Sequence, residues 1–263
     1  MLGAVRLGVP NSRRTLAIYV AAGASFAALS ARGLTVPLYA HELGADRFQV
    51  GALFSVATLA AALLSMPSGV LIDRFGTRTL LALSIVISAG SQFAMIATAS
   101  VPPLYLWQIV GGLAIGAQQA ALFSAITALV PSNRLGRSMG WLTFSMQVGF
   151  FMGPSIAGVL LQWIDLRTDI AVTTALLVFA IPGAMAASTA PQSGQKLALM
   201  QPLRALLSQR SFGPVVIGLV AATLAWGTVG AFLPIFGKES LGLPSAQIGL
   251  MLSIQAVANG LAR

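Results

Sequence analysis

The chain has 263 residues, of which 57% are hydrophobic and 8% are charged, and its formal net charge is +9. A soluble domain carries about 25% charged residues, so this composition excludes a water-exposed surface over most of the chain. The basic residues are spread over several connectors, which argues against a nucleic-acid-binding module, and the lack of cysteine excludes disulfides and thiolate chemistry.

Apolar runs of roughly 20 residues alternate with short charged connectors, and a run of this length crosses a bilayer as a helix. Strict alternation of apolar and polar residues is absent, which argues against a membrane β-barrel. We therefore predict an all-α, polytopic membrane helical bundle surrounded by lipid. In chain order, the predicted spans are roughly 15–40, 48–72, 79–99, 103–130, 138–163, 170–190, 212–236 and 245–263.

The longest connector divides the chain into two predicted bundles. It separates a six-helix bundle, residues 1–190, from the start of a second bundle, residues 212–263, and residues 191–211 form the predicted cytoplasmic linker. Within the linker, Leu197–Leu207 is amphipathic and is predicted to lie along the membrane surface. The connectors of one side carry 10 Lys or Arg residues and those of the other side carry 3. This bias predicts a cytoplasmic N-terminus in the cell (inner) membrane.

An internal repeat relates the first and seventh predicted spans. Pro37-Leu-Tyr-Ala-His-Glu-Leu-Gly44 is echoed by Pro234-Ile-Phe-Gly-Lys-Glu-Ser-Leu-Gly242, with one residue inserted. Parallel repeats about an axis along the membrane normal are a feature of transporters. The repeat predicts that the seventh span restarts the pattern of the first, and that the chain is truncated within its eighth helix.

The connector after the second span reads Gly69-Val-Leu-Ile-Asp73-Arg74-Phe-Gly76-Thr-Arg78. It resembles the loop signature of the major facilitator superfamily, which lies between spans 2 and 3. In that family the loop latches one bundle to the other and helps to gate alternating access. The resemblance implies a gating role for Gly69, Asp73, Arg74, Gly76 and Arg78; the alternative is an ordinary basic cytoplasmic loop.

The fifth span reads Gly149-Phe-Phe-Met-Gly153-Pro154-Ser-Ile-Ala157-Gly158. It resembles the glycine–proline pattern of the drug/proton antiporter branch of the superfamily, with Ala157 in place of a glycine. The resemblance implies an efflux protein in which Gly149, Gly153, Pro154 and Gly158 form a helix-packing motif. The alternative is a stripe of small residues that serves packing, as in any polytopic protein.

Four residues are candidates for the substrate cavity, because the family resemblance places spans 1, 4 and 7 around it. They are Arg32, Gln108, Gln119 and Trp226. An intramembrane arginine usually faces a cavity or a partner, although snorkelling towards the headgroups is the alternative for Arg32. Gln108 stands where antiporters of the family often have arginine, and no Asp or Glu lies mid-span in any predicted helix. We therefore expect any proton carrier to lie in the part of the second bundle beyond this chain or to work differently.

Together these features predict a secondary active transporter that moves a small solute outward by alternating access, with or without a coupling ion. One alternative is an importer of a small organic anion, which Arg32 favours. A truncated fragment without transport activity is another. A membrane enzyme is disfavoured, because His41 and Asp73 lie on opposite predicted sides. No catalytic residue, metal or cofactor is expected.

Overall fold

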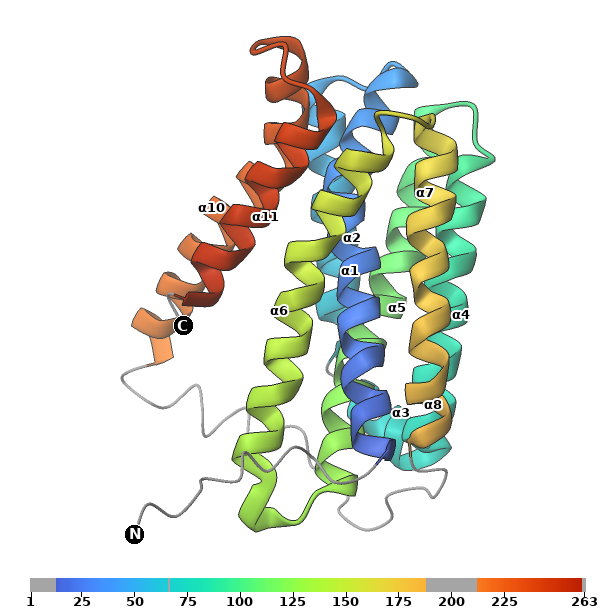
Figure 1. The fold of residues 1–263 in the computed structure, drawn as a ribbon, viewed down its shortest axis with the longest axis vertical. Coiled ribbons are helices and arrows are strands. Elements are labelled where there is room, and N and C mark those ends of the chain that lie inside the picture. Colours follow the sequence, from blue (N-terminus) through green and yellow to red (C-terminus); the bar gives the residue numbers. More distant parts are fainter. Residues whose placement is uncertain (1–12, 66, 188–211, 262–263) are drawn as a thin grey trace, which may run out of the picture.

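The computed structural model describes residues 13–65, 67–187 and 212–261, and this part of the chain is built from helices (Figure 1). The predicted linker 191–211 and its segment Leu197–Leu207 lie outside the described residues. The α-helices are α1 (Arg13–Glu42), α2 (Arg47–Ser65), α3 (Ser68–Phe75), α4 (Thr77–Ile96), α5 (Val101–Leu129), α6 (Leu135–Leu160), α7 (Leu166–Ala175), α8 (Ile181–Ala186), α10 (Phe212–Glu239) and α11 (Ser245–Leu261).

Six segments of the described chain are long and apolar enough to cross a membrane, and they correspond to the first six predicted spans. The sixth is interrupted, since a 3₁₀ segment, Leu176–Ala180, joins α7 to α8. Large apolar side chains such as Leu63, Val86 and Phe179 are exposed on this bundle, as expected of a surface that faces lipid. The prediction of an all-α membrane bundle is confirmed.

Figure 1 shows the long helices of the first six spans side by side, with α10 and α11 as an inclined pair beside α6. We call the end at which α1 begins the inner end of the molecule, and the opposite end the outer end. The ribbons of α10 and α11 approach the first bundle at the outer end and diverge from α6 towards the inner end.

Two predicted boundaries are corrected by the structure. The second predicted span is divided, because α2 ends at Ser65 and Pro67, which lacks a backbone donor, precedes α3. The sixth span begins at Leu166 rather than at residue 170, so it contains Asp169. Asp169 lies in the first turn of α7, at the end of this span.

Small residues set the close approach of α2 and α5. A Cβ at Gly112 would collide with the carbonyl of Ala57, and a Cβ at Gly116 would collide with the carbonyl of Ala61. Backbones that approach this closely gain van der Waals contact, which is the main attraction between helices in lipid. The repeated four-residue spacing of glycine on α5 thus determines which face of that helix receives α2.

The buried apolar residues form two clusters, one in each half of the molecule. The inner cluster includes Ile18, Leu81 and Leu142 and, among the described residues, contains none from α10 or α11. The outer cluster includes Ile235 of α10 and Ile248 of α11. The second bundle is therefore held to the first by apolar packing in the outer half.

Candidate functional site

Arg32 lies in the interior of the first bundle, where its side chain is 6% exposed. Its Nη2 donates to Oε1 of Gln108 on α5 at 2.5 Å. Its Nη1 is buried and has no hydrogen-bond partner among the described residues. A guanidinium carries five N–H donors and no acceptor, so this site retains donor capacity for a further group.

A glycine of α5, Gly111, makes room for the guanidinium of Arg32, which belongs to α1. A Cβ at Gly111 would lie 3.1 Å from Nη1 and from Nη2 of Arg32, and 2.9 Å from Oγ of Ser91 on α4. The charge is therefore enclosed by α1, α4 and α5. This position is inside the bundle, away from the headgroup region that a snorkelling side chain would reach.

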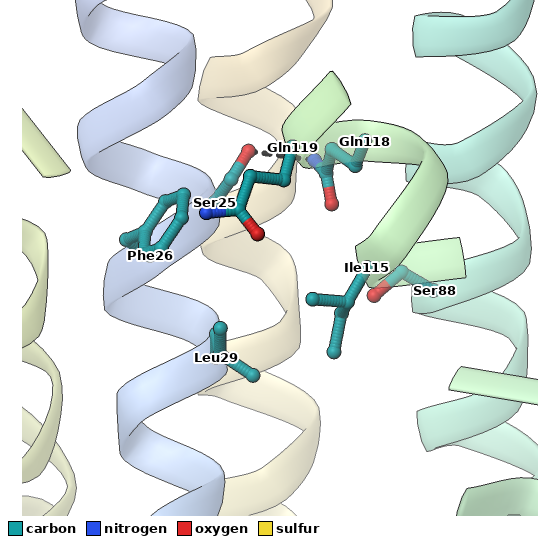
Figure 2. Close-up of a pocket in the computed structure, with 7 residues that line it drawn as sticks. All are labelled: Ser25, Phe26, Leu29, Ser88, Ile115, Gln118 and Gln119. Atoms are coloured by element: carbon teal, nitrogen blue, oxygen red, sulfur yellow. Dashed lines mark hydrogen bonds between the residues drawn. The ribbon is translucent and has the colours of Figure 1, made fainter. Parts of the chain in front are cut away.

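A second polar cluster lies further towards the inner end, around a small cavity (Figure 2). Gln118 donates from Nε2 to Oγ of Ser25 on α1 at 2.7 Å, while Gln119 lines the same cavity beside Phe26 and Leu29. The cavity measures about 10 Å³, which is close to the space that one water molecule needs. This cavity can hold water but is too small for an organic solute.

The other cavity candidates are placed differently. Gln108 is buried, whereas Gln119 is exposed, although both lie on α5. Trp226 lies within α10, but its side chain is outside the part of the chain that the structure describes. The structure therefore pairs Arg32 with Gln108 and leaves the grouping of all four candidates as a prediction.

The loop from Gly69 to Arg78 forms α3 and the turn into α4. Gly76 has φ = 82°, a backbone conformation that side chains disfavour, and its N–H donates to the carbonyl of Ile72. The Arg74 guanidinium lies 5.3 Å from the centre of the Phe75 ring. Asp73 is partly exposed and forms no ion pair with a described residue. The glycine requirement is thus explained by the turn, and the gating role stays a prediction.

The small-residue motif of α6 contacts two helices. A Cβ at Gly149 or Gly153 would collide with the backbone of α1, at Gly23 and Ala27 respectively. Further along α6, a Cβ at Gly158 would lie 2.5 Å from the carbonyl of Ser245, and a Cβ at Gly249 of α11 would collide with the carbonyl of Pro154. Small residues on two faces of α6 therefore allow close packing against α1 on one side and α11 on the other.

Polar contacts between the two bundles accompany this packing. Ser253 of α11 donates from Oγ to the carbonyl of Phe151 at 2.6 Å. At the outer end, Glu239 of α10 pairs with Nε2 of His41 at 2.7 Å and with Nη2 of Arg47 at 3.8 Å. Since His41 lies in the last turn of α1 and Arg47 begins α2, the carboxylate of Glu239 bridges both helices to α10.

A sequence profile described as Major Facilitator Superfamily matches residues 18–263. The chain belongs to this family. The family and its members of known structure are transporters rather than enzymes, which removes the membrane-enzyme alternative.

Two kinds of curated relative resemble this member of the Major Facilitator Superfamily. The Quinolone resistance protein NorA of Staphylococcus aureus is 23% identical over 127 residues, which cover 48% of this chain and 33% of NorA. The uncharacterized MFS-type transporter MJ1560 of Methanocaldococcus jannaschii is 28% identical over 123 residues, which cover 47% of this chain and 32% of that protein. The matched segment thus spans about a third of each relative.

Solved structures of other transporters share the fold. A bacterial homologue of the human lysosomal transporter Spinster, in an inward-facing and unoccupied conformation, has a TM-score of 0.77 at 16% identity. That match covers 92% of this chain and 59% of the Spinster homologue. The nucleoside transporter NupG also has a TM-score of 0.77, at 15% identity, over 95% of this chain and 66% of NupG. At these identities the likeness concerns the fold alone.

Sequence reasoning missed one buried acid in this Major Facilitator Superfamily chain. Asp169 is 0% exposed, and neither carboxylate oxygen has a hydrogen-bond partner among the described residues. Asp165 is the residue that could have revealed the true start of this span. It caps α7 by accepting from the Thr168 hydroxyl at 2.6 Å and from the amides of Arg167 and Thr168. An aspartate in this pattern marks a helix start, which places Asp169 in the first turn of the span.

Proposed function

We propose that the protein is a secondary active transporter that moves a small solute outward by alternating access between two bundles. The observation that carries this proposal is the two-sided packing of α6, whose small residues contact α1 on one face and α11 on another. A helix shared in this way provides a surface on which one bundle can rock against the other. Transporters with parallel repeats bind substrate between such bundles.

The contacts between the bundles support a state that is closed at the outer end. The apolar cluster that includes α10 and α11 lies in the outer half, and the Glu239 ion pairs lie at the outer tip. To alternate, these contacts must separate while contacts at the inner end form. We propose that the loop containing Asp73, Arg74 and Arg78 supplies that inner contact, as the family resemblance implies.

We further propose that Arg32, Gln108, Gln119 and Trp226 face the substrate path. Nη1 of Arg32 supports this, because it has no acceptor among the described residues. A buried donor without an acceptor is costly, and charges inside membrane spans usually mark functional sites. Gln108 holds the other side of the guanidinium and so orients it. On this proposal, a solute that reaches Arg32 accepts the hydrogen bond that Nη1 now lacks.

The outward direction rests on the likeness to NorA, whose name describes quinolone resistance, and on the glycine–proline pattern of α6. The test is the accumulation of a quinolone in cells that express the protein, compared with Arg32→Ala and Asp73→Asn variants whose membrane insertion is checked. We expect lower accumulation with the wild-type protein only. Equal accumulation in cells with wild type and cells without the protein would argue against quinolone efflux.

Uptake of a small organic anion is the second candidate function, and the unpartnered Nη1 of Arg32 favours it. An anion would accept from the guanidinium in a bidentate geometry that lysine cannot reproduce. Uptake of radiolabelled organic anions by the same cells distinguishes the two functions. Uptake that Arg32→Ala abolishes and Arg32→Lys reduces would favour the importer, whereas quinolone exclusion without anion uptake would favour efflux.

A further inference from the structure

A cavity of about 270 Å³ lies at the inner end of the first bundle, away from the proposed substrate path. Arg14 of α1 and Arg78 of α4 line it, together with Leu129 at the end of α5 and Met185 of α8. Figure 1 shows the start of α1 and the end of α8 at the same end of the bundle. Four segments that are distant in sequence therefore bring two guanidinium groups to one hollow.

The chain itself provides little negative charge for these two arginines. Neither Arg14 nor Arg78 forms an ion pair with a described residue. The residues outside the described ranges contain no Asp or Glu, so they offer no side-chain carboxylate. Four of the six acids lie at the outer end, in connectors or at the tips of helices: Glu42, Asp46, Asp165 and Glu239. A fifth, Asp169, lies in the first turn after Asp165. Only Asp73 lies near the inner end, and it does not line this cavity.

The size and the lining of the cavity select the chemistry of a ligand. A volume of 270 Å³ exceeds that of one water molecule many times and is close to the ~300 Å³ at which small-molecule pockets begin. Guanidinium groups bind phosphate oxygens with paired N–H donors. Basic pockets between transmembrane helices at the cytoplasmic side suit anionic lipid headgroups.

The surface beside the cavity suits lipid acyl chains. Met185, which lines the cavity, is 63% exposed, and Ile181 one turn away on α8 is 46% exposed. On α4, the helix that carries Arg78, Leu83 and Val86 are exposed. Apolar side chains exposed on the same two helices provide a surface for chains that continue from a headgroup into the bilayer.

We propose that Arg14 and Arg78 form a binding site for the phosphate group of an anionic phospholipid. The phosphodiester enters the hollow between α1, α4, α5 and α8, and its acyl chains lie against α4 and α8. Arg78 also belongs to the loop motif, so an occupied site would fix the start of α4. This proposal does not depend on the substrate or on the direction of transport.

The test measures lipid binding to the purified chain in detergent by native mass spectrometry and by the shift in thermal unfolding temperature. The probes are phosphatidylglycerol, phosphatidylcholine and inorganic phosphate. The variant is Arg14→Gln/Arg78→Gln, and the matched control is Arg134→Gln/Arg137→Gln. The control removes two exposed basic residues from the same end of the molecule, outside the cavity. If the variant with both cavity changes does not insert, Arg14→Gln alone replaces it, because Arg14 is exposed.

We expect phosphatidylglycerol to bind in preference to phosphatidylcholine, and the cavity variant to bind it about thirtyfold more weakly, since each of the two basic residues contributes roughly 1 kcal/mol of attraction to an anionic lipid. The control should bind it as the wild type does. Equal weakening in both double variants would overturn the proposal, because it would indicate general attraction to a basic face. Equal binding of the two lipids would also overturn it. Displacement of the lipid by millimolar inorganic phosphate would overturn the lipid as occupant and assign the site to a soluble anion.

Discussion

At the scale of single residues, the hydrogen bond from Arg32 to Oε1 of Gln108 provides an acceptor for a buried guanidinium. Replacing Gln108 by Leu removes the acceptor of Nη2 and leaves the guanidinium buried. We predict that Gln108→Leu lowers the free energy of unfolding by roughly 1–3 kcal/mol, the cost of a lost buried hydrogen bond to a charged group. Thermal unfolding in detergent measures the change.

Gln119→Leu is the matched control for Gln108, because it makes the same chemical change on the same helix at an exposed position. Its effect should be within about 0.5 kcal/mol, as for most exposed substitutions. If both leucine variants unfold at the wild-type temperature, the Arg32–Gln108 bond does not stabilise the bundle.

Asp169 presents the opposite situation, because its buried carboxylate has no donor within the part of the chain that the structure describes. Asparagine has nearly the same shape and carries no charge, so its burial is less unfavourable. We predict that Asp169→Asn raises the unfolding temperature at neutral pH, by the equivalent of roughly 1 kcal/mol or more. Asp73→Asn, on the partly exposed α3, should leave it nearly unchanged. A fall in the Asp169→Asn unfolding temperature would indicate a donor to the carboxylate.

At the scale of helices, the close approach of α2 and α5 can be tested directly by substitution. Gly112→Ala places a methyl group against the Ala57 carbonyl, so α2 must move away. We predict a loss of roughly 1–3 kcal/mol, as for other overpacked sites. Gly90→Ala is the control, because a Cβ there meets no heavy atom within 4 Å. It should stabilise α4 by roughly 0.5–1 kcal/mol. Urea titration of tryptophan fluorescence compares the two variants, and equal effects would contradict the packing argument.

The helices were predictable from sequence because a membrane span needs only length and apolarity, and both are local properties. The points at which the spans divide or begin were harder to predict. Pro67 and the Asp165 cap act on single backbone groups, and an average of hydropathy over a span does not show such local effects. The loop and α6 motifs were recognised by residue type. Their partners were not, because the spacing of Gly149 and Gly153 indicates a small face without identifying Gly23 and Ala27 of α1 as its neighbours.

The candidate site shows the same limit. The burial of Arg32 followed from its position in the first span. That Nη1 lacks a partner among the described residues depends on three helices that meet in space. The inner-end cavity was not predicted at all, because Arg14 and Arg78 are far apart in sequence and each resembles an ordinary headgroup-facing residue.

At the scale of the whole molecule, the orientation in the membrane is open to a labelling experiment. The excess of basic residues at one side predicts that Arg137 faces the cytoplasm and Lys238 the outside. Both side chains are exposed, and the chain has no cysteine of its own. In intact cells, an impermeant maleimide should label Lys238→Cys and not Arg137→Cys, whereas both should react after the cells are lysed. Labelling of Arg137→Cys in intact cells would reverse the orientation.

The closure of the outer end depends on contacts that the molecule must break to alternate. Glu239→Gln removes the charge that pairs α10 with His41 and Arg47. Partly exposed pairs contribute only about 0.2–1 kcal/mol each, so the protein should still fold. A loss of this size nevertheless multiplies the ratio of open to closed molecules by roughly 1.4 to 5 for each ion pair. The chosen reporter is Gly51→Cys, because Phe232 of α10 covers this position on α2. An impermeant maleimide added outside should label Gly51→Cys faster in the Glu239→Gln background.

The control is Glu42→Gln, because Glu42 lies at the end of α1 and forms no ion pair with a described residue. It should leave the labelling rate unchanged. If Glu239→Gln and Glu42→Gln label at the same rate, the ion pairs do not hold the outer end closed, and the other contacts between the bundles, which include the apolar packing of Ile235 and Ile248, are sufficient.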